Sequence, residues 1–352
     1  MVFLARSGAV SAEIICIAAG ALLLSVWLTG LVRKSALARG VLDIPNERSS
    51  HQSAMPRGGG LAMVLAFTAS LVALASIGGQ RGAVLLALAG GGLAVAAIGF
   101  VDDRRPVPPA WRLAVHLAAA VWAVAWLGGL PALTIGNLTL SLSWIGYLLA
   151  VLSIVWTLNL FNFMDGIDGI AASEAVFICG SAGILGLLYP GGAASVGALA
   201  WIFCAACLGF LVWNWPPARI FMGDVGSGYL GFVIAVLAIA ADHDDPAAPW
   251  PWLILGGVFF VDASVTLVHR ALRGERVYEA HRTHAYQWLA RRWGHRRVTV
   301  SVWVVNVLWL LPCAAFATAH PARAIWVLIV AFVPLTWIAL AAGAGRAQAR
   351  SV

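Results

Sequence analysis

Charged residues are scarce in this sequence of 352 residues: 11% are Asp, Glu, Lys or Arg, while 61% are hydrophobic. Soluble domains have roughly 25% charged and 45–50% apolar residues, so a water-soluble fold of this length could not cover its surface. Disorder is excluded by the same apolar content. The chain has only five cysteines, all within apolar stretches, where free thiols pack as small hydrophobes, and this excludes a disulfide scaffold. The composition therefore predicts an all-α integral membrane protein.

Long apolar runs occupy most of the chain. A membrane-spanning helix needs about 20 apolar residues. Eleven runs qualify, at residues 10–32, 60–78, 83–101, 112–130, 143–162, 170–189, 194–213, 226–241, 250–271, 298–318 and 323–343. They leave no room for a second domain, so we expect residues 1–352 to form one polytopic bundle of about eleven transmembrane helices. The alternating stretch 131–142 predicts a small surface hairpin, and the first run is too long for a cleaved signal peptide.

The basic residues indicate the orientation of these helices. If the N-terminus lies outside, the inside segments are 33–59, 102–111, 163–169, 214–225, 272–297 and the C-terminal tail. Only Arg6, Arg81 and Arg323 of the 22 Lys and Arg residues then lie outside, as the positive-inside rule requires. The net charge of +7 thus predicts a cytoplasmic face suited to anionic lipids and substrates, and nucleic acid is not needed to explain it.

Acidic residues follow the inside ends of three spans. They are Asp102, Asp103, Asp165, Asp168 and Asp224. Any one of them could be an ordinary solvated loop residue, but carboxylates near the hydrocarbon boundary are costly and tend to be functional. Several on one face would repel one another unless a cation neutralised them. A hard ion such as Mg²⁺ binds one or two carboxylates together with substrate phosphates.

The residues around these acids strengthen the prediction. Asn159, Asn162, Asp165 and Asp168 are spaced by three, which would place them along one helical face. Glycines accompany the acids: Gly166 and Gly169 in the first motif, and Gly223, Gly226 and Gly228 around Asp224. Glycine lets a backbone approach a ligand closely, and N–H groups near Asp224 could cradle phosphate.

Two inside segments carry further candidates. His281 and His284 flank Arg282 in HRTHAYQ, and their spacing would put both imidazoles on one helix face. They could bind phosphate, orient a nucleophile or cap a helix, while the surrounding arginines are equally explained as a topology anchor. In the first inside segment, Arg57 follows Arg48 and His51 and precedes Gly58-Gly59-Gly60. This segment is either part of the site or a turn-rich connector.

Three other features lie away from these motifs. Asp262, inside the ninth span, needs a partner, and it could orient His269 as a base or form a structural pair with its neighbours. The run Asp242–Asp245 falls on the outside, where we expect a solvated loop. Gly90-Gly91-Gly92 is typical of a helix-packing surface.

With these residues in place, the chain resembles the polyprenyl-phosphate N-acetylhexosamine-1-phosphate transferases (glycosyltransferase family 4). This family includes the bacterial phospho-MurNAc-pentapeptide translocase. The resemblance extends from DIPNERSSH at 43–51 to HRTHAYQ at 281–287. It is carried by DD at 102–103, NLFNFMDGIDG at 159–169, NWPPARIFMGDVGS at 214–227 and the histidine motif. YEAHRTHAYQ is more similar to the O-antigen-initiating branch than to the peptidoglycan branch.

The resemblance implies transfer of N-acetylhexosamine 1-phosphate from a UDP-sugar to undecaprenyl phosphate in the bacterial inner membrane, with release of UMP. It implies Mg²⁺, with Mn²⁺ as an alternative, held by Asp224 and Asp103. Asp102 would handle the lipid phosphate, and His281 and His284 would contact the diphosphate or the sugar. The substrate residues would be Asp168, Gly166, Asn214 and Phe221 near the uridine, with Asn159, Asn162, Arg57 and Arg282. A homodimer is a further expectation.

One motif departs from the family pattern. The first motif often reads DDxxK, and Pro106 occupies the Lys position, which leaves Arg104 or Arg105 as the substitute cation. Whether an Asp acts as base or as nucleophile stays open, as do the sugar and the polyprenol length. Two other classes are a secondary transporter and a CDP-alcohol phosphotransferase. The first predicts acids near the midplane and related halves, and the second predicts a DGxxAR motif that is absent here.

Overall fold

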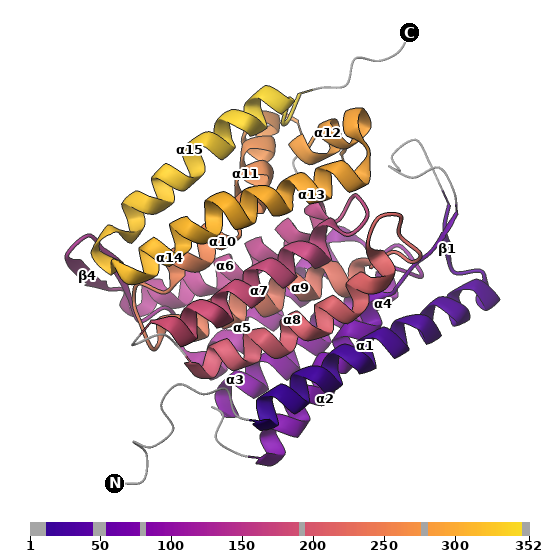
Figure 1. Ribbon diagram of the computed structural model, residues 1–352, viewed down its shortest axis with the longest axis horizontal. Helices are drawn as coiled ribbons and strands as arrows, with labels where there is room; N and C mark the ends of the chain where they lie inside the picture. Colours follow the sequence, from indigo (N-terminus) through magenta and orange to yellow (C-terminus); the bar gives the residue numbers. More distant parts are fainter. Residues whose placement is uncertain (1–11, 45–53, 78–81, 190–193, 276–280, 347–352) are drawn as a thin grey trace.

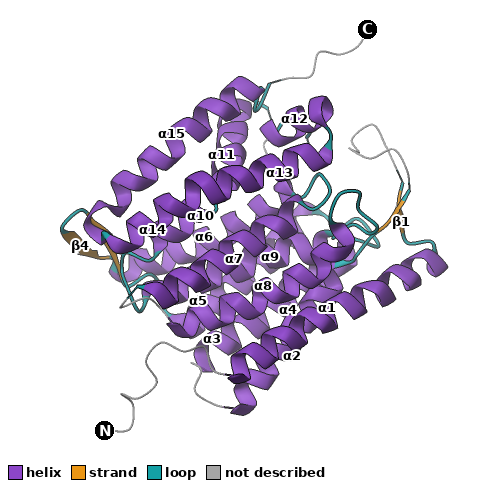
Figure 2. Ribbon diagram, in the orientation of Figure 1, coloured by secondary structure: helices purple, strands orange, loops and turns teal. Residues whose placement is uncertain are grey.

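The computed structural model describes residues 12–44, 54–77, 82–189, 194–275 and 281–346. These residues are almost entirely helical (Figure 2). The helices are α1 (Ala12–Arg39), α2 (Gly60–Ile77), α3 (Gly82–Leu86), α4 (Gly92–Asp102), α5 (Pro109–Leu127), α6 (Ser143–Met164), α7 (Ile170–Leu188), α8 (Ala194–Asn214), α9 (Asp224–Asp242), α10 (Pro249–Leu255), α11 (Gly257–Leu272), α12 (Ala285–Trp293), α13 (His295–Val305), α14 (Leu311–Ala319) and α15 (Ala324–Ala342). π-Helical turns η1 (Ala87–Gly91) and η2 (Asn306–Leu310) join α3 to α4 and α13 to α14, and the 3₁₀ turn η3 (Pro321–Arg323) precedes α15.

The predicted membrane architecture is confirmed. Within the described ranges, ten helical segments are long and apolar enough to span a membrane, or eleven if the bent pair α10–α11 counts as one. The ninth predicted span, 250–271, is therefore not a straight helix, because α10 and α11 meet at a 78° bend. The bend falls at Gly256-Gly257, where α10 ends and α11 begins, as is common for a kink at small residues.

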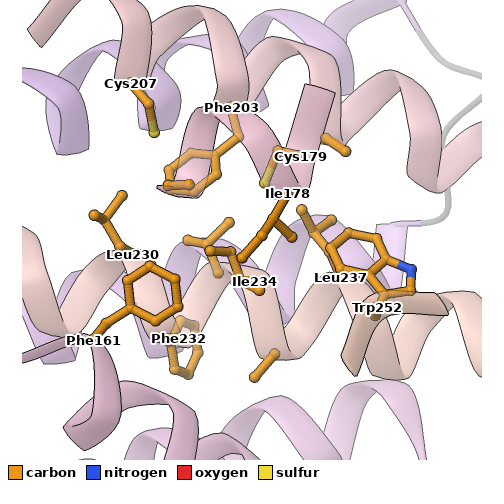
Figure 3. Packing of buried hydrophobic residues seen from close by; sticks show 14 of the residues in the cluster. Phe161, Ile178, Cys179, Phe203, Cys207, Leu230, Phe232, Ile234, Leu237 and Trp252 are labelled. Atoms are coloured by element: carbon orange, nitrogen blue, oxygen red, sulfur yellow. The ribbon is translucent and has the colours of Figure 1, made fainter. Parts of the chain in front are cut away.

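Helix α9 lies at the centre of the bundle (Figure 1). It packs against α6, α4 and α2, and 89% of the residues in its most apolar stretch are buried within the protein. Figure 3 shows part of this core, where Phe203 and Cys207 of α8 face Leu230 and Ile234 of α9. The expected packing role of the cysteines agrees with this position, because Cys179 and Cys207 are buried free thiols.

Close approach of the helices to α9 depends on glycine. An added Cβ on Gly91 or Gly92 would collide with the rings of Phe232 and Tyr229 of α9, which confirms the packing role predicted for Gly90-Gly91-Gly92. Gly60, the first residue of α2, has Gly226 of α9 where a Cβ would stand. At these points the helices can approach so closely because glycine has no side chain.

The two ends of the bundle differ. At one end, β3 (Ala132–Ile135) and β4 (Leu138–Ser141) form the predicted antiparallel hairpin. The short strands β1 (Leu42–Asp43) and β2 (Met55–Pro56) pair at the other end, on the side where α12 also lies (Figure 1). The segments predicted to be inside thus gather at one end, while the compartment that this end faces stays a prediction.

Two predicted boundaries were wrong. Helix α1 continues to Arg39 instead of ending near residue 32, because its last turns are basic and alanine-rich and remain good helix formers after the apolar run stops. The predicted inside loop 272–297 contains helix α12 and the start of α13. Helix α12 is amphipathic and too short to span a membrane, so a search for apolar runs does not detect it.

Candidate active site

The N-terminus of α9 carries a carboxylate and is capped by another. Asp224 is the first residue of the helix, and Gly223 before it has φ +77°, a left-handed conformation that favours glycine. The Asp103 carboxylate accepts hydrogen bonds from the backbone N–H groups of Asp224 (2.8 Å) and Val225 (3.2 Å). Asp103 therefore caps α9 from another helix end. Burial raises the pKa of Asp103, although Arg57 and these two N–H groups oppose the change.

This cap also explains how the DD motif reaches Asp224. Gly99 of α4 has the Asp224 backbone where a Cβ would stand, so α4 and α9 touch at the turn just before the motif. The predicted phosphate cradle at Gly223, Gly226 and Gly228 was wrong. The first two N–H groups of α9 bind Asp103, and the next two, of Gly226 and Ser227, bind the Gly223 carbonyl. Gly226 instead allows close packing against Gly60 and Met222, whereas a Cβ on Gly228 would meet only ordinary contacts.

Arg57 joins two of the site carboxylates. Its Nε lies 2.8 Å from Asp103 Oδ1, and its Nη2 lies 3.3 Å from Asp224 Oδ1. Backbone hydrogen bonds fix the segment that carries it, since Phe221 N–H donates to the Pro56 carbonyl and Gly59 N–H donates to the Phe221 carbonyl. The first inside segment is therefore part of the site. Arg48 and His51 lie outside the described residues.

Arg112 is the cation that the sequence interpretation missed. Its Nη1 lies 2.9 Å from Asp102 Oδ2 and 3.7 Å from Asp224 Oδ2, while Asp102 Oδ1 accepts the Val107 N–H at 2.6 Å. Arg104 does not replace the missing lysine, because its guanidinium folds over the Phe100 ring at 3.4 Å. Arg105 is exposed. The available signal was the position of Arg112 at the inside end of its span, ten residues after Asp102.

The four residues spaced by three do not share one helical face. Helix α6 ends at Met164, because the glycine-rich DGIDG segment leaves the helix. Asn162 Nδ2 donates to Asp224 Oδ1 (3.1 Å) and to Ser227 Oγ (2.9 Å), so it belongs to the site. Asn159 instead donates to the Val155 carbonyl of its own helix.

The two acids of DGIDG have different surroundings. Burial, followed by the nearby Asp224 carboxylate, raises the pKa of Asp165 to about 7. Asp168 Oδ2 accepts the Ala218 N–H at 3.1 Å, and its Oδ1 lies 3.2 Å from His295 Nδ1. The sequence placed His295 on the inside, but its contact with Asp168 was not predicted. Asp168 therefore links its own loop to the 214–223 segment and to α13.

Other predicted substrate residues form the walls of this region. The Gly169 N–H donates to Asn214 Oδ1 (3.0 Å), and Asn214 Nδ2 donates to the Ile220 carbonyl (2.9 Å). Asn214 thus ties the DGIDG loop to the segment carrying Phe221, which is half-buried. Gly166 has the Tyr286 hydroxyl where a Cβ would stand. The contacts give these residues a scaffold role, and their predicted contacts with uridine stay predictions.

The spacing predicted that His281 and His284 share one helix face, and this was wrong. His284 is the residue before α12, and His281 lies three residues earlier in an irregular segment. Their rings nevertheless stack, with centroids 4.9 Å apart. Burial, and next the neighbouring His284, lowers the pKa of His281 to about 3, so this imidazole is neutral at physiological pH. Arg282 between them is half-buried.

A cavity of about 620 Å³ opens beside these charges. Arg112, Asn162 and Asp224 line one part of it. The rest is largely apolar and is formed by α4, α5, α6, α9 and α11, with Leu113, Leu152, Val155, Trp156 and Leu267 among the lining residues. The space therefore joins a charged end to an apolar channel, which is the shape that an anionic amphiphile requires.

The donor set suits a hard divalent cation. Asp224 was predicted to hold the metal with Asp103, but both Asp103 oxygens accept N–H groups of α9. Asp102 is the carboxylate that lies close to the Asp224 side chain, and Asn162 donates to Asp224. Within the described ranges, no three His, Cys, Asp or Glu side chains form a ready-made metal cluster. Mg²⁺ usually binds through one or two carboxylates and completes its shell with water and phosphate, so these oxygens fit Mg²⁺ and do not fit a closed zinc site.

Two other predictions have different outcomes. Of the two alternatives for Asp262, the contacts support a structural pair, because Asp262 contacts His284, whereas His269 Nδ1 lies 2.8 Å from the Ala344 carbonyl. Asp242 was expected in a solvated loop, but it is fully buried at the end of α9, since α9 continues one residue beyond the predicted span.

Comparisons with known proteins agree with this geometry. Residues 85–242 match glycosyl transferase family 4. A decaprenyl-phosphate N-acetylglucosaminephosphotransferase of Mycobacterium tuberculosis is 30% identical over 330 residues, covering 83% of this chain and 80% of the relative. The chain belongs to glycosyl transferase family 4.

Two further relatives show how far the family likeness extends. A phospho-N-acetylmuramoyl-pentapeptide-transferase of Moorella thermoacetica is 33% identical, covering 73% of this chain and 82% of the relative. A probable undecaprenyl-phosphate N-acetylglucosaminyl 1-phosphate transferase of Bacillus subtilis is 26% identical, covering 92% of this chain and 90% of the relative. Family membership and the helices together identify a multi-pass membrane enzyme, and they favour a transferase over the transporter and CDP-alcohol alternatives.

Proposed function

We propose that this protein transfers N-acetylhexosamine 1-phosphate from a UDP-sugar to a polyprenyl phosphate, releasing UMP and forming a polyprenyl-diphosphate sugar. The observation that carries the proposal is the junction of charge and apolar space at Asp224. There Arg57 and Arg112 lie within 4 Å of the carboxylate, at one end of a largely apolar cavity of about 620 Å³. Relatives whose names specify polyprenyl-phosphate substrates support it.

The acceptor would lie in this cavity with its phosphate at the charged end. Arg112 reaches from α5 to Asp102 and Asp224, so its guanidinium stands where the phosphate of an inserted lipid would arrive. Guanidinium donors bind phosphate oxygens with fixed geometry. Apolar residues such as Leu113 and Trp156 would cover the first isoprene units, whose burial supplies most of the affinity.

The reaction joins two anions, so its barrier is chiefly electrostatic and positional. Mg²⁺ held by Asp224, with Asp102 close by, would neutralise the donor diphosphate when bound. Arg57 supplies a fixed positive charge on the other side of Asp224, and Asn162 fixes the rotamer of this carboxylate. The acceptor oxygen attacks the sugar-linked phosphorus, and the bond to the UMP oxygen breaks. A lipid phosphate is already anionic at neutral pH, so a strong base is not required.

The test is a reconstituted assay of UMP release. We expect UMP only when a UDP-N-acetylhexosamine, undecaprenyl phosphate and Mg²⁺ are all present. Asp224→Asn should reduce the rate by at least about 100-fold, because removal of one electrostatic contact to a transition state costs roughly 10²–10³. Asp245→Asn, at the opposite end of the bundle, is the matched control and should keep the wild-type rate. Failure of every UDP-sugar to yield UMP would overturn the proposal.

We further propose the cytoplasmic face of a bacterial inner membrane as the location, and O-antigen-type envelope polysaccharide as the product pathway. Charge asymmetry supports the location, since the site lies at the end rich in arginine. The YEAHRTHAYQ segment supports the pathway. A screen of UDP-GlcNAc, UDP-FucNAc, UDP-QuiNAc and UDP-MurNAc-pentapeptide defines the sugar. Loss of the O-antigen ladder after gene deletion tests the pathway, and an intact ladder with a cell-wall defect would refute it.

A further inference from the structure

Asp262 is a buried carboxylate on α11 that serves a different helix. Its side chain is 6% exposed. Oδ1 accepts hydrogen bonds from the Ala285 N–H (2.9 Å) and Thr266 Oγ1 (3.1 Å), and Oδ2 accepts the Tyr286 N–H (2.9 Å). His284 Nδ1 lies 3.3 Å from Oδ1. Three of these four contacts join α11 to the segment that carries the histidine motif.

These contacts make Asp262 the cap of α12. The first N–H groups of a helix have no partner within it, and here the first two donate to one carboxylate from another span. Gln287 Oε1 accepts the His284 N–H at 3.3 Å and closes the same end from within the helix. Hydrogen bonds to a charged acceptor in a buried setting are strong, so the start of α12 is fixed to α11.

The same carboxylate helps to orient the ring of His284. His284 Nδ1 lies 3.3 Å from Asp262 Oδ1, and the His284 side chain also faces the Gln287 backbone N–H as the other half of the capping box of α12. The His284 side chain is 2% exposed and therefore has almost no surface for substrate. Its ring packs against those of His281, at 4.9 Å, and Phe163, at 6.5 Å, and these two rings also contact each other at 6.4 Å.

His281 is consequently the imidazole available at the edge of the site. It is only partly buried, and its Nδ1 lies 3.1 Å from Thr283 Oγ1, which leaves Nε2 for a ligand. Its ring packs on His284 at 4.9 Å and on Phe163 at 6.4 Å, and the position of the His284 ring depends on Asp262. The chain of contacts thus runs from a membrane-spanning helix to the exposed histidine.

We propose that Asp262 is a positioning residue that acts through His284, and that His281 is the member of the histidine motif that touches the donor. This inference rests on the proposed function for the identity of the donor. It assigns the two histidines different tasks: His284 transmits the position of α11, and His281 presents its Nε2 to the diphosphate or the sugar.

The test compares two buried carboxylates. Asp262→Asn retains the size of the side chain but replaces one accepting oxygen by an NH₂ group that faces the N–H groups of α12. Glu174→Gln is the matched control: Glu174 of α7 is 1% exposed, and its Oε2 accepts a hydrogen bond from Asn306 Nδ2 at 2.6 Å. Both changes remove a buried acid within a span, and only the first one touches α12.

We expect Asp262→Asn to lower kcat by about 10- to 100-fold, the range for residues that orient active-site ligands, with the donor KM changed less than about threefold. Glu174→Gln should keep kcat within about twofold. Solid-state ¹⁵N spectra of histidine-labelled protein in bilayers give a second readout. The imidazole ¹⁵N signals that disappear in His284→Gln should be shifted in Asp262→Asn and unchanged in Glu174→Gln.

Two outcomes would overturn the inference. One is wild-type kcat in Asp262→Asn, and the other is a His284 signal that Asp262→Asn leaves unchanged. Equal losses of kcat in Asp262→Asn and Glu174→Gln would indicate general destabilisation and would also refute positioning. If wild type releases no UMP, the proposed function fails, yet the ¹⁵N spectra still decide whether Asp262 positions His284.

Discussion

Replacing Asp103 by alanine separates two roles for this carboxylate. As a metal ligand, Asp103 would matter only when Mg²⁺ is bound. As the cap of α9, it stabilises the protein without metal, because it accepts the N–H groups of Asp224 and Val225. We therefore expect Asp103→Ala to lower the unfolding temperature of the metal-free protein, and the loss to persist in EDTA.

The magnitude follows from the contacts. Loss of a helix cap costs about 1 kcal/mol. The hydrogen bond from Arg57 would add about 1.5–3 kcal/mol if buried, but the Arg57 side chain is 31% exposed, so we take about 1 kcal/mol. Burial of the Asp103 carboxylate, which raises its pKa, offsets part of this. A net loss of about 1–2 kcal/mol corresponds to roughly 2–6 °C for a chain of this size.

The assay is thermal unfolding in nanodiscs, with and without Mg²⁺. Asp245→Ala is the control, because Asp245 accepts the Ala247 N–H at 2.9 Å in a turn at the far end of the bundle. That variant should lose stability without any change in UMP release, whereas Asp103→Ala should lose both. The capping argument would be refuted if metal-free Asp103→Ala unfolded at the wild-type temperature and differed from wild type only in a smaller stabilisation by Mg²⁺.

Three further predictions concern the same end of the bundle. Arg112→Gln should raise the KM for undecaprenyl phosphate about tenfold with little change in donor KM, since one charged hydrogen bond is worth about 1.5 kcal/mol or more; equal effects on both substrates would contradict this placement. Gly223→Ala should lower the free energy of unfolding by about 1–2 kcal/mol, because the φ of Gly223 is +77° and an added Cβ would meet the Asp103 carboxylate. Gly228→Ala is the control and should unfold near the wild-type temperature, since its added Cβ would have its nearest neighbour at 3.4 Å. The pKa of His281 is lowered to about 3, below its usual value near 6.5. As pH decreases, the unfolded chain therefore binds a proton before the folded protein does, and stability should fall between about pH 6.5 and pH 3. The unfolding temperature of His281→Gln should depend less on pH in this range, and an unchanged dependence would show that His281 titrates normally.

Much of the architecture could be predicted because the bilayer imposes a simple length rule. Eleven apolar runs anticipated the spans, and the alternating stretch 131–142 anticipated the hairpin. The bend at Gly256 could not be predicted, because two adjacent glycines are equally compatible with a packed straight helix. Helix α12 was missed because its helical pattern is amphipathic and shorter than a span.

The sequence predicted most of the residues that form the site, but it predicted less well which residues they contact. Placing Asp102, Asp103 and Asp224 on one face required only topology. Their pairing with Arg57 and Arg112 depends on how α4, α5 and α9 approach one another, and that approach is set by Gly99 and other tertiary contacts. Asp262 shows the same limit: the sequence indicated that it needs a partner, but His269 was nearer along the chain than His284.

The central position of α9 has a consequence for motion at the site. Amide hydrogens of a helix enclosed on all sides exchange with solvent mainly when the whole protein unfolds, and α9 is the most enclosed span, with 89% of its window buried against 22% for α5. We therefore expect the amides inside α9 to be among the slowest to exchange in the part of the chain that the structure describes. Asp224 begins this helix, whereas Arg112 belongs to a helix that is far less enclosed. Backbone hydrogen bonds hold the segment of Arg57 in place, so Arg112 is the arginine at Asp224 whose helix has more freedom to move when a bulky lipid enters or leaves.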